Sequence, residues 1–216
     1  MKLGFGVFPM PDGLKRPVVE DWPKLACTSV DEIEIYWHSF CRPGWTNLAL
    51  TLPNHVVVDV DLKNNGWTGL AKLEADHGRL PATRRHRTGL GGVHLIYAKH
   101  AGSDGLFNKP LDPWRYPGID IKVNYNGLIV APGSRSAAGL YVIEDDRECA
   151  PAPEFLSDTQ QNARYQPPTN APHASYGVAR MTFEELAALP ADDPYRSSYP
   201  WNGQEPSARG RPVAPG

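Results

Sequence analysis

Hydrophobic and polar positions alternate along the first 150 residues with two spacings, one typical of helices and one of strands. A helix is predicted after Ser29, because Ser29 and Glu32 have the spacing of a capping box and apolar residues follow at helical intervals. Those residues are Ile33, Tyr36, Trp37 and Phe40. A second helix is predicted over residues 68–77, ended by Gly78. Strands are predicted over residues 47–52, 55–62, 83–88, 93–98, 118–123, 127–131 and 139–143, and residues 3–9 are predicted to form a short strand or an entry loop.

Glycine, proline and asparagine separate these predicted strands. Pro53-Asn54 divides the strands of 47–52 and 55–62, and residues 89–92 form a glycine turn between two further strands. The strands of 118–123 and 127–131 are predicted to form a similar hairpin pair. Because hairpins dominate the middle of the chain and helices are interspersed, the pattern favours a mixed α+β fold over a doubly wound parallel sheet.

The composition changes at about Asp158. The chain contains 20 glycines and 22 prolines, and residues 158–181 are polar and proline-rich. We therefore predict a folded catalytic domain over residues 1–157 and a linker or tail over residues 158–216. One short helix is predicted within the tail, over residues 182–189, and a tail of this kind also fits a piece of a longer protein.

Charge and cysteine content exclude several classes of protein. A formal net charge of −2 and a pI of about 6.4 argue against non-specific binding of duplex DNA, so any nucleic-acid contact needs a local basic patch. Cys27, Cys41 and Cys149 form no Cys-X-X-Cys pair, which argues against a disulfide framework and a cysteine-rich zinc site. No apolar run has the length of a membrane span or of a signal peptide, so a cytoplasmic protein without membrane contact is expected.

An acidic pair, Asp59 and Asp61, interrupts a strand that is otherwise strongly apolar. Side chains alternate along a strand, so both carboxylates face one way while Val56, Val58 and Val60 face the core. Two neighbouring carboxylates repel each other, and a hard cation such as Mg²⁺ or Mn²⁺ relieves that repulsion. The alternative is that the two aspartates only solvate the strand face or cap its end.

A glycine turn follows a basic run. The run is Arg84-Arg85-His86-Arg87, and the turn leads through Gly91 and Gly92 to His94. Glycines allow backbone N–H groups to approach a phosphate closely, and His94 can donate to one. The arginines can hold a triphosphate or a template backbone. The alternative is a plain hairpin with a surface histidine and a solvated charge run.

A third acid, Asp120, lies in another short apolar strand, Gly-Ile-Asp-Ile-Lys-Val. A carboxylate in such a strand is costly unless it is exposed, paired or bound to a metal. Lys122 can pair with Asp120 or contact a phosphate. An exposed strand edge is the alternative explanation.

Together, these three elements resemble the bifunctional primase-polymerase domain of the archaeo-eukaryotic primase superfamily, which is frequent in phages and plasmids. The likeness runs from Lys15-Arg16-Pro17 and Trp22 to about Phe155. It differs from the common pattern of the family at Leu90 and Val93, which flank the two glycines.

The resemblance implies a primase-polymerase fold, with a catalytic sheet similar to an RNA-recognition motif and an associated α/β lobe. It implies two Mg²⁺ or Mn²⁺ ions held by Asp59, Asp61 and Asp120, and nucleotide phosphates bound at His94 beside Gly91 and Gly92. We add three weaker predictions of phosphate contact, at Lys63, Arg87 and Lys122. Two further residues, Arg84 and Arg85, are predicted to hold the nucleic-acid backbone.

The function that follows from this resemblance is template-directed nucleotidyl transfer in DNA replication. The expected partners are nucleoside triphosphates, a single-stranded DNA template with its primer, and a fused or separate helicase. One alternative is a metal-dependent nuclease or phosphodiesterase, which uses the same acids but attacks with water. The other is a non-catalytic nucleic-acid-binding replication module, in which the acids are dispensable.

Overall fold

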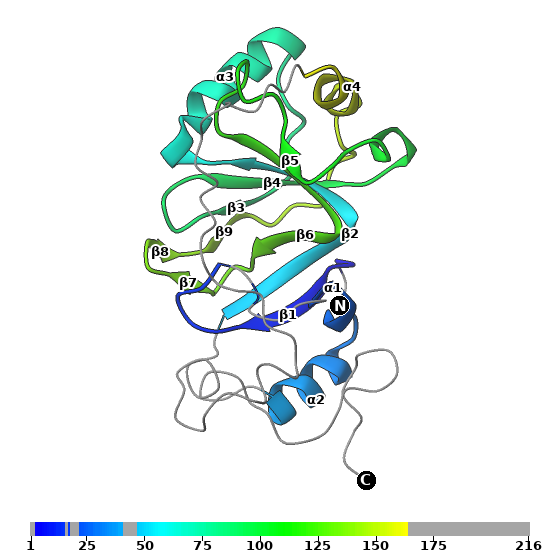
Figure 1. The fold of residues 1–216 in the computed structure, drawn as a ribbon, viewed down its shortest axis with the longest axis vertical. Coiled ribbons are helices and arrows are strands. Elements are labelled where there is room, and N and C mark those ends of the chain that lie inside the picture. The colour runs from blue at the N-terminus through cyan, green and yellow to red at the C-terminus, as the bar shows by residue number, and fades with distance from the viewer. Residues whose placement is uncertain (1–2, 16, 18–21, 41–46, 164–216) are drawn as a thin grey trace, which may run out of the picture.

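The fold is taken from a computed structural model, which describes residues 3–15, 17, 22–40 and 47–163 (Figure 1). The predicted tail helix of residues 182–189 and Cys41 lie outside these residues. None of the helices in the described part of the chain has the length and apolar character needed to cross a membrane.

A seven-stranded antiparallel sheet forms the centre of the molecule. Its strands are β1 (Gly6–Met10), β2 (Asn47–Val60), β3 (Arg84–Arg87), β4 (Val93–Ala98), β5 (Lys109–Pro110), β6 (Ile119–Val130) and β9 (Val142–Asp145). Their order is β5-β6-β2-β4-β3-β9, and β1 pairs with the first half of β2. A small separate ribbon is formed by β7 (Arg135–Ser136) and β8 (Gly139–Leu140).

Helices cover the two ends of this sheet, as Figure 1 shows. The described helices are α1 (Trp22–Leu25), α2 (Val30–Phe40), α3 (Gly66–His77) and α4 (Phe155–Asn162), with short 3₁₀ turns at Leu62–Asn64 and Ala101–Ser103. One core cluster joins Val56, Val58 and Val60 to Leu73 of α3, and a second joins Met10 to Tyr36 of α2. The mixed α+β class predicted from the sequence is confirmed.

The capping box of α2 is present as predicted. The backbone N–H of Glu32 donates to Ser29 Oγ at 3.2 Å, and the backbone N–H of Ser29 donates to Glu32 Oε2 at 3.3 Å. This exchange satisfies two N–H groups that the first turn of a helix leaves without partners. The second predicted helix corresponds to α3, which begins two residues earlier than predicted, at Gly66.

Two predicted strand breaks are wrong. Residues 47–60 form one continuous strand, β2, and the predicted hairpin of 118–123 and 127–131 is instead the single strand β6. The two long strands pair with each other, and their register shifts beside Leu52. On β6, Asn124 takes a left-handed φ of 64°, and a Cβ on Gly127 would lie 2.2 Å from the Val123 carbonyl oxygen. These residues therefore produce a bulge within a strand pair, not a reversal of the chain.

Two further boundaries differ from the sequence prediction. The strand predicted over 139–143 is divided into β8 and β9, with Tyr141 between them. The predicted start of the linker at residue 158 falls inside α4, where Gln160 is buried. α4 packs on the loop that precedes β5 through Gln160 and Phe107, and the end of the catalytic domain at residue 157 stays a prediction.

Candidate active site

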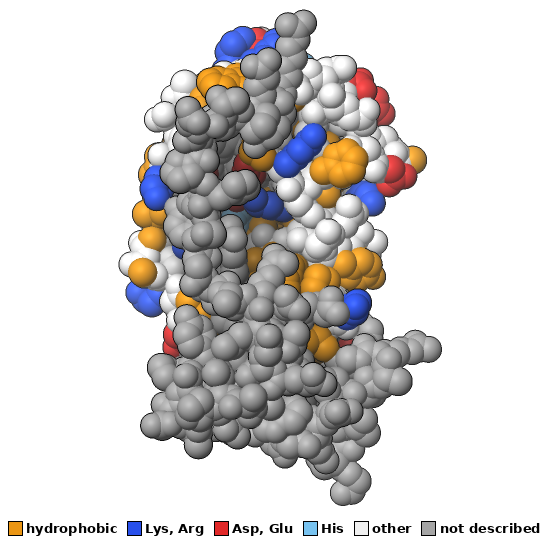
Figure 2. Space-filling model, viewed as in Figure 1, with side chains coloured by type: hydrophobic (Ala, Val, Ile, Leu, Met, Phe, Trp, Pro, Cys, Tyr) orange, Lys and Arg blue, Asp and Glu red, His pale blue; other side chains and the backbone are white. Residues whose placement is uncertain are grey.

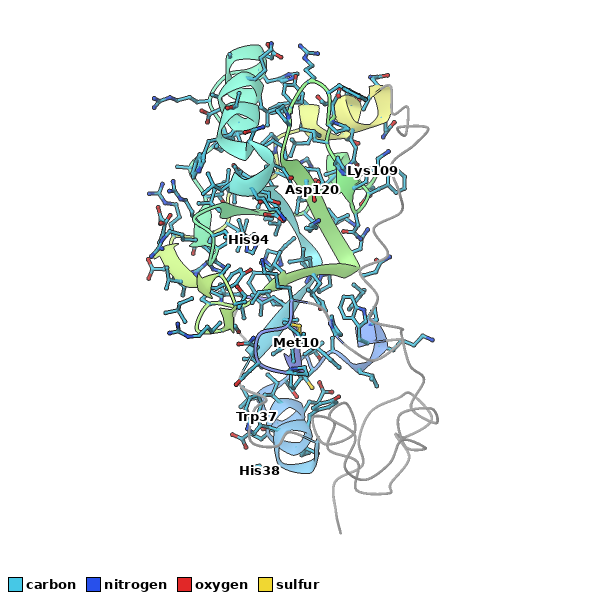
Figure 3. All side chains as sticks on the ribbon, turned by 60° about the vertical axis from the view of Figure 1, so that its left-hand side comes forward. Met10, Trp37, His38, His94, Lys109 and Asp120 are labelled. Atoms are coloured by element: carbon cyan, nitrogen blue, oxygen red, sulfur yellow. The ribbon has the colours of Figure 1, made fainter. Side chains whose placement is uncertain are left out.

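Four polar side chains form a row across the middle of the sheet. Asp120 of β6 lies directly opposite Asp59 of β2, which lies opposite His94 of β4, which lies opposite His86 of β3. Residues that face each other across antiparallel strands project from the same side of the sheet. Figure 3 shows His94 and Asp120 in the middle of the molecule, far from Trp37 and His38 of α2. Acidic, basic and histidine side chains also meet near the middle of the face seen in Figure 2.

Asp59 occupies the centre of this row. Its side chain is 22% exposed, and its Oδ1 lies 3.7 Å from His94 Nε2. Burial raises the pKa of Asp59 to about 7; the positive charge of Lys122 opposes this rise, and the negative charges of Asp120 and Asp61 add to it. Burial is the main cause of this rise, and a positive charge beside the carboxylate, such as a bound cation, would oppose it.

Asp61 follows the last residue of β2 and serves two purposes. Its Oδ1 accepts a hydrogen bond from the backbone N–H of Lys63 at 2.9 Å, and its Oδ2 accepts one from Asn64 Nδ2 at 2.7 Å. The carboxylate thus caps the 3₁₀ turn, as one alternative reading of the sequence proposed. Its charge also acts on Asp59, as the raised pKa of Asp59 records. Lys63 itself is exposed on this turn.

Asp120 is paired with a neighbour on its own strand. Lys122 Nζ lies 2.9 Å from Asp120 Oδ2, and the two side chains are 25% and 37% exposed. The lysine supplies one positive charge to a site with three carboxylates. Lys122 therefore forms the ion pair with Asp120 that was one of its two predicted roles, and its contact with a phosphate stays a prediction.

The donor set fits hard divalent cations. Asp59, Asp61 and Asp120 offer only oxygen atoms, which Mg²⁺ and Mn²⁺ prefer. Within the described ranges, however, no three His, Cys, Asp or Glu side chains are arranged closely enough to hold one ion together. The residues thus have the right chemistry, and the assignment of these three as metal ligands stays a prediction.

His94 is held in the row as a neutral side chain. It is buried, and its ring stacks on the Tyr141 ring with centroids 6.1 Å apart. Burial, followed by the charges of Lys122 and Lys15, lowers the pKa of His94 to about 3. A neutral imidazole has one N–H donor and one acceptor nitrogen, so His94 can donate one hydrogen bond to an anionic ligand.

The glycine turn before His94 is required by the packing of β4. Gly91 has a left-handed φ of 87°, and a Cβ on Gly92 would lie 2.3 Å from the Val60 carbonyl oxygen. The N–H of Gly91 donates to the Thr88 carbonyl oxygen at 2.9 Å, inside the turn. Both glycines therefore shape the hairpin, and phosphate contact by their N–H groups stays a prediction.

The basic run of β3 does not act as one patch. Arg85 and Arg87 lie opposite Leu95 and Val93, on the side of the sheet covered by α3, whereas Arg84 shares the face of the polar row. Both exposed arginines pair with Glu144, at 2.7 Å and 3.0 Å. The structure thus does not bring Arg85 or Arg87 to the carboxylates, because neighbouring residues of a strand point to opposite faces.

Two residues of the site were not assigned from the sequence. Lys15 acts electrostatically on both Asp59 and His94, and its loop is fixed to β7 by a bridge between Gly13 and Ser136. His86 completes the polar row beyond His94. The period of two along β3 would have placed His86 on one face with Arg84, whereas no sequence pattern reveals that Lys15 lies near the acids.

The sequence match to a family model agrees with this geometry. The model describes the bifunctional DNA primase/polymerase N-terminal domain and matches residues 1–155. The chain belongs to this primase/polymerase family. The matched range of this primase/polymerase domain contains all four residues of the polar row, and it also contains Asp61. No curated protein matches the sequence.

Family membership implies activity of the primase/polymerase type in DNA replication, and hence binding of nucleic acid and nucleotides. Such an enzyme is a nucleotidyltransferase, and the family generally uses divalent metal ions.

Proposed function

We propose that this domain catalyses template-directed nucleotidyl transfer, extending or starting a strand on a single-stranded DNA template with nucleoside triphosphates. The observation that carries the proposal is the row of Asp120, Asp59 and His94 on three neighbouring strands, with Asp61 two residues after Asp59 just beyond the end of β2. It combines carboxylates for hard cations with a neutral donor for phosphate on one face of a rigid sheet.

The side chains have distinct roles in this proposal. Asp59, Asp61 and Asp120 hold the cations, and His94 donates its N–H to a phosphate of the incoming nucleotide. When bound, Mg²⁺ or Mn²⁺ ions supply Lewis acidity that lowers the pKa of the primer 3′-hydroxyl and offsets charge on the leaving pyrophosphate. Lys122 and Lys15 place positive charge around the same carboxylates, which opposes the rise in the pKa of Asp59 that burial causes.

Extension of a labelled primer on a single-stranded template tests this function. The wild type is expected to extend the primer with Mg²⁺ or Mn²⁺, and Asp59→Asn is expected to lose at least about 100-fold in rate, since removing one catalytic electrostatic group costs that much. Asp104→Asn is the matched control, because Asp104 is an exposed carboxylate whose side chain is 70% exposed and pairs with Lys99.

The outcomes separate the proposal from its alternatives. Equal extension by Asp59→Asn and the wild type contradicts the assignment of the acids. Cleavage of the primer in place of extension identifies a metal-dependent nuclease. Binding of the oligonucleotide without either reaction, unchanged by Asp59→Asn, identifies a non-catalytic replication module.

A further inference from the structure

The polar row ends at a buried histidine that has no hydrogen-bond partner. His86 is 3% exposed, and among the described residues neither its Nδ1 nor its Nε2 has a partner. The Nδ1 atom of the facing His94 lacks a partner as well. Buried polar atoms are nearly always satisfied in folded proteins, so three unsatisfied nitrogens on two facing rings require an explanation.

A buried positive charge lies beside this pair. Arg84 shares the face of His86, two residues away along β3, and is 8% exposed. It donates from Nη2 to the Asp146 carbonyl oxygen, but its Nε has no partner and no carboxylate of the described residues pairs with it. A buried guanidinium without an anion is unfavourable, since buried charges are normally paired.

The three side chains are complementary to an anion. His86 and His94 face each other across neighbouring strands, and an imidazole ring carries at least one N–H donor whether it is neutral or protonated. Two imidazole donors and a guanidinium offer hydrogen bonds and a positive charge, but no negative charge. A phosphate group, with several acceptor oxygens and negative charge, matches them.

We propose that Arg84 and His86 extend the phosphate site of His94 into a subsite that receives the phosphates farthest from the reacting α-phosphate. This inference rests on the proposed function, which places the α-phosphate at the carboxylates of Asp59 and its neighbours. Strands in a sheet lie about 4.8 Å apart, so His94 is one strand spacing from Asp59 and His86 is two. The distal phosphates of the nucleotide extend along this row, away from the primer end.

Calorimetric titration without primer or template tests the subsite. The ligands are dATP, dAMP and inorganic pyrophosphate, each with Mg²⁺. The variant His86→Phe keeps the ring volume and removes both nitrogens. We expect it to weaken dATP binding about tenfold or more, as loss of a hydrogen bond to a charged group does, and to leave dAMP binding unchanged. His86→Asn, which keeps an N–H donor, is expected to retain most of the dATP affinity.

Neighbouring arginines supply a matched control. Arg84→Met is expected to weaken dATP binding, whereas Arg85→Met, whose side chain lies on the opposite face and pairs with Glu144, is expected to leave it unchanged. If pyrophosphate affinity falls together with dATP affinity, the subsite also holds the released product. If only dATP affinity falls, the subsite recognises the intact triphosphate alone.

The subsite is overturned if folded His86→Phe and Arg84→Met bind dATP and pyrophosphate as tightly as the wild type. In that case the unpaired nitrogens are satisfied by buried water only.

Thermal melting checks the fold, and His86→Phe is expected to melt no lower than the wild type, because it removes unsatisfied polar atoms. The assay requires no primer extension, so a wild type that binds dATP but extends nothing contradicts the proposed function and not the subsite.

Discussion

At the scale of the residue, the candidate site is built from side chains that destabilise the fold. Asp59 is largely buried next to Asp120 and Asp61, and His86 has no partner for either nitrogen within the described chain. An apolar side chain at the same position would stabilise the folded state more than a buried polar group without a partner does. In the two proposals above, a ligand completes the interactions of these side chains.

The metal-free stability of Asp59→Asn tests this cost. The pKa of Asp59 is raised from 3.8 to about 7 in the folded protein. Above pH 7 the side chain is ionised in both states, and its ionisation costs more free energy in the folded state than in the unfolded chain. Folding is then disfavoured by up to about 4 kcal/mol, and the penalty falls as the pH drops from 7 to 4. Replacement by asparagine removes the penalty.

We therefore expect Asp59→Asn to be more stable than the wild type at pH 8 in the presence of a chelator, with a gain that disappears at about pH 4. Urea unfolding at several pH values measures the difference. Saturating Mg²⁺ or Mn²⁺ should reduce the gain at pH 8, because the cation stabilises the wild-type carboxylates. A gain that is constant with pH would mean that Asp59 ionises normally.

At the scale of the element, sequence patterns identified most helices and strands but not their continuity. The β-branched run at Val56, Val58 and Val60 and the capping box at Ser29 are local signals, and both were read correctly. Residues 53–54 and 124–126 were read as breaks, yet they lie within the continuous strands β2 and β6. Whether such a residue reverses a chain or bends it depends on the partner strand, which local sequence does not contain.

The same limit applies to the site. Asp59, Asp120 and His94 were identified from their strands and from the family resemblance, and the register brings them side by side. The arginines of β3 were predicted together, although alternation along the strand separates Arg84 from its neighbours. Lys15 lies far from the acids in sequence, and only the folded chain places its charge near Asp59.

The hairpin before β4 gives a prediction at this scale. A Cβ on Gly92 would lie 2.3 Å from the carbonyl oxygen of Val60, so Gly92→Ala forces β4 away from the end of β2. We expect a loss of roughly 1–3 kcal/mol in the free energy of unfolding. Primer extension should fall as well, because His94 follows two residues later.

Leu90→Ala is the control for this substitution. Leu90 lies in the same turn and is 45% exposed, so its truncation should change the stability by less than about 0.5 kcal/mol. Chemical unfolding followed by circular dichroism compares the two variants. Equal stability of Gly92→Ala and Leu90→Ala would mean that β2 and β4 do not approach as closely as the hairpin requires.

At the scale of the whole molecule, a seven-stranded sheet carries the polar row on strands that are fixed from both sides. The cluster around Leu73 of α3 packs behind Val58 and Val60, and a second cluster around Val57 and Ile96 packs on the other face. The row thus lies on a rigid support, which suits a site whose ligands must be positioned closely. Because the net charge of the chain is −2, attraction of nucleic acid depends on local positive groups such as Lys15 and Lys122.

The position of α4 predicts where the folded domain ends. Gln160 is 1% exposed and lies against the segment that leads into β5, the strand beside Asp120. Its Nε2 donates to the carbonyl oxygens of Phe107 at 3.1 Å and of Lys109 at 3.2 Å, and its Oε1 accepts from the N–H of Phe107 at 2.8 Å. We expect a chain ending at residue 163 to unfold like the full chain. A chain ending at residue 157 should lose about 2–4 kcal/mol, because several buried backbone groups lose their partners.

The point variant Gln160→Ala separates these hydrogen bonds from the rest of the helix. It is expected to reproduce much of the loss within the chain ending at residue 163, and Gln161→Ala, whose Nε2 donates to Ser157 Oγ of its own helix at 3.2 Å, is expected to have a smaller effect. Urea unfolding compares the full chain, the two truncated chains and the two point variants. If the chain ending at 157 is as stable as the one ending at 163, α4 does not belong to the folded domain, and the boundary predicted from composition at residue 158 holds. If it is less stable, residues 158–162 complete the edge of the sheet on which Asp120 depends.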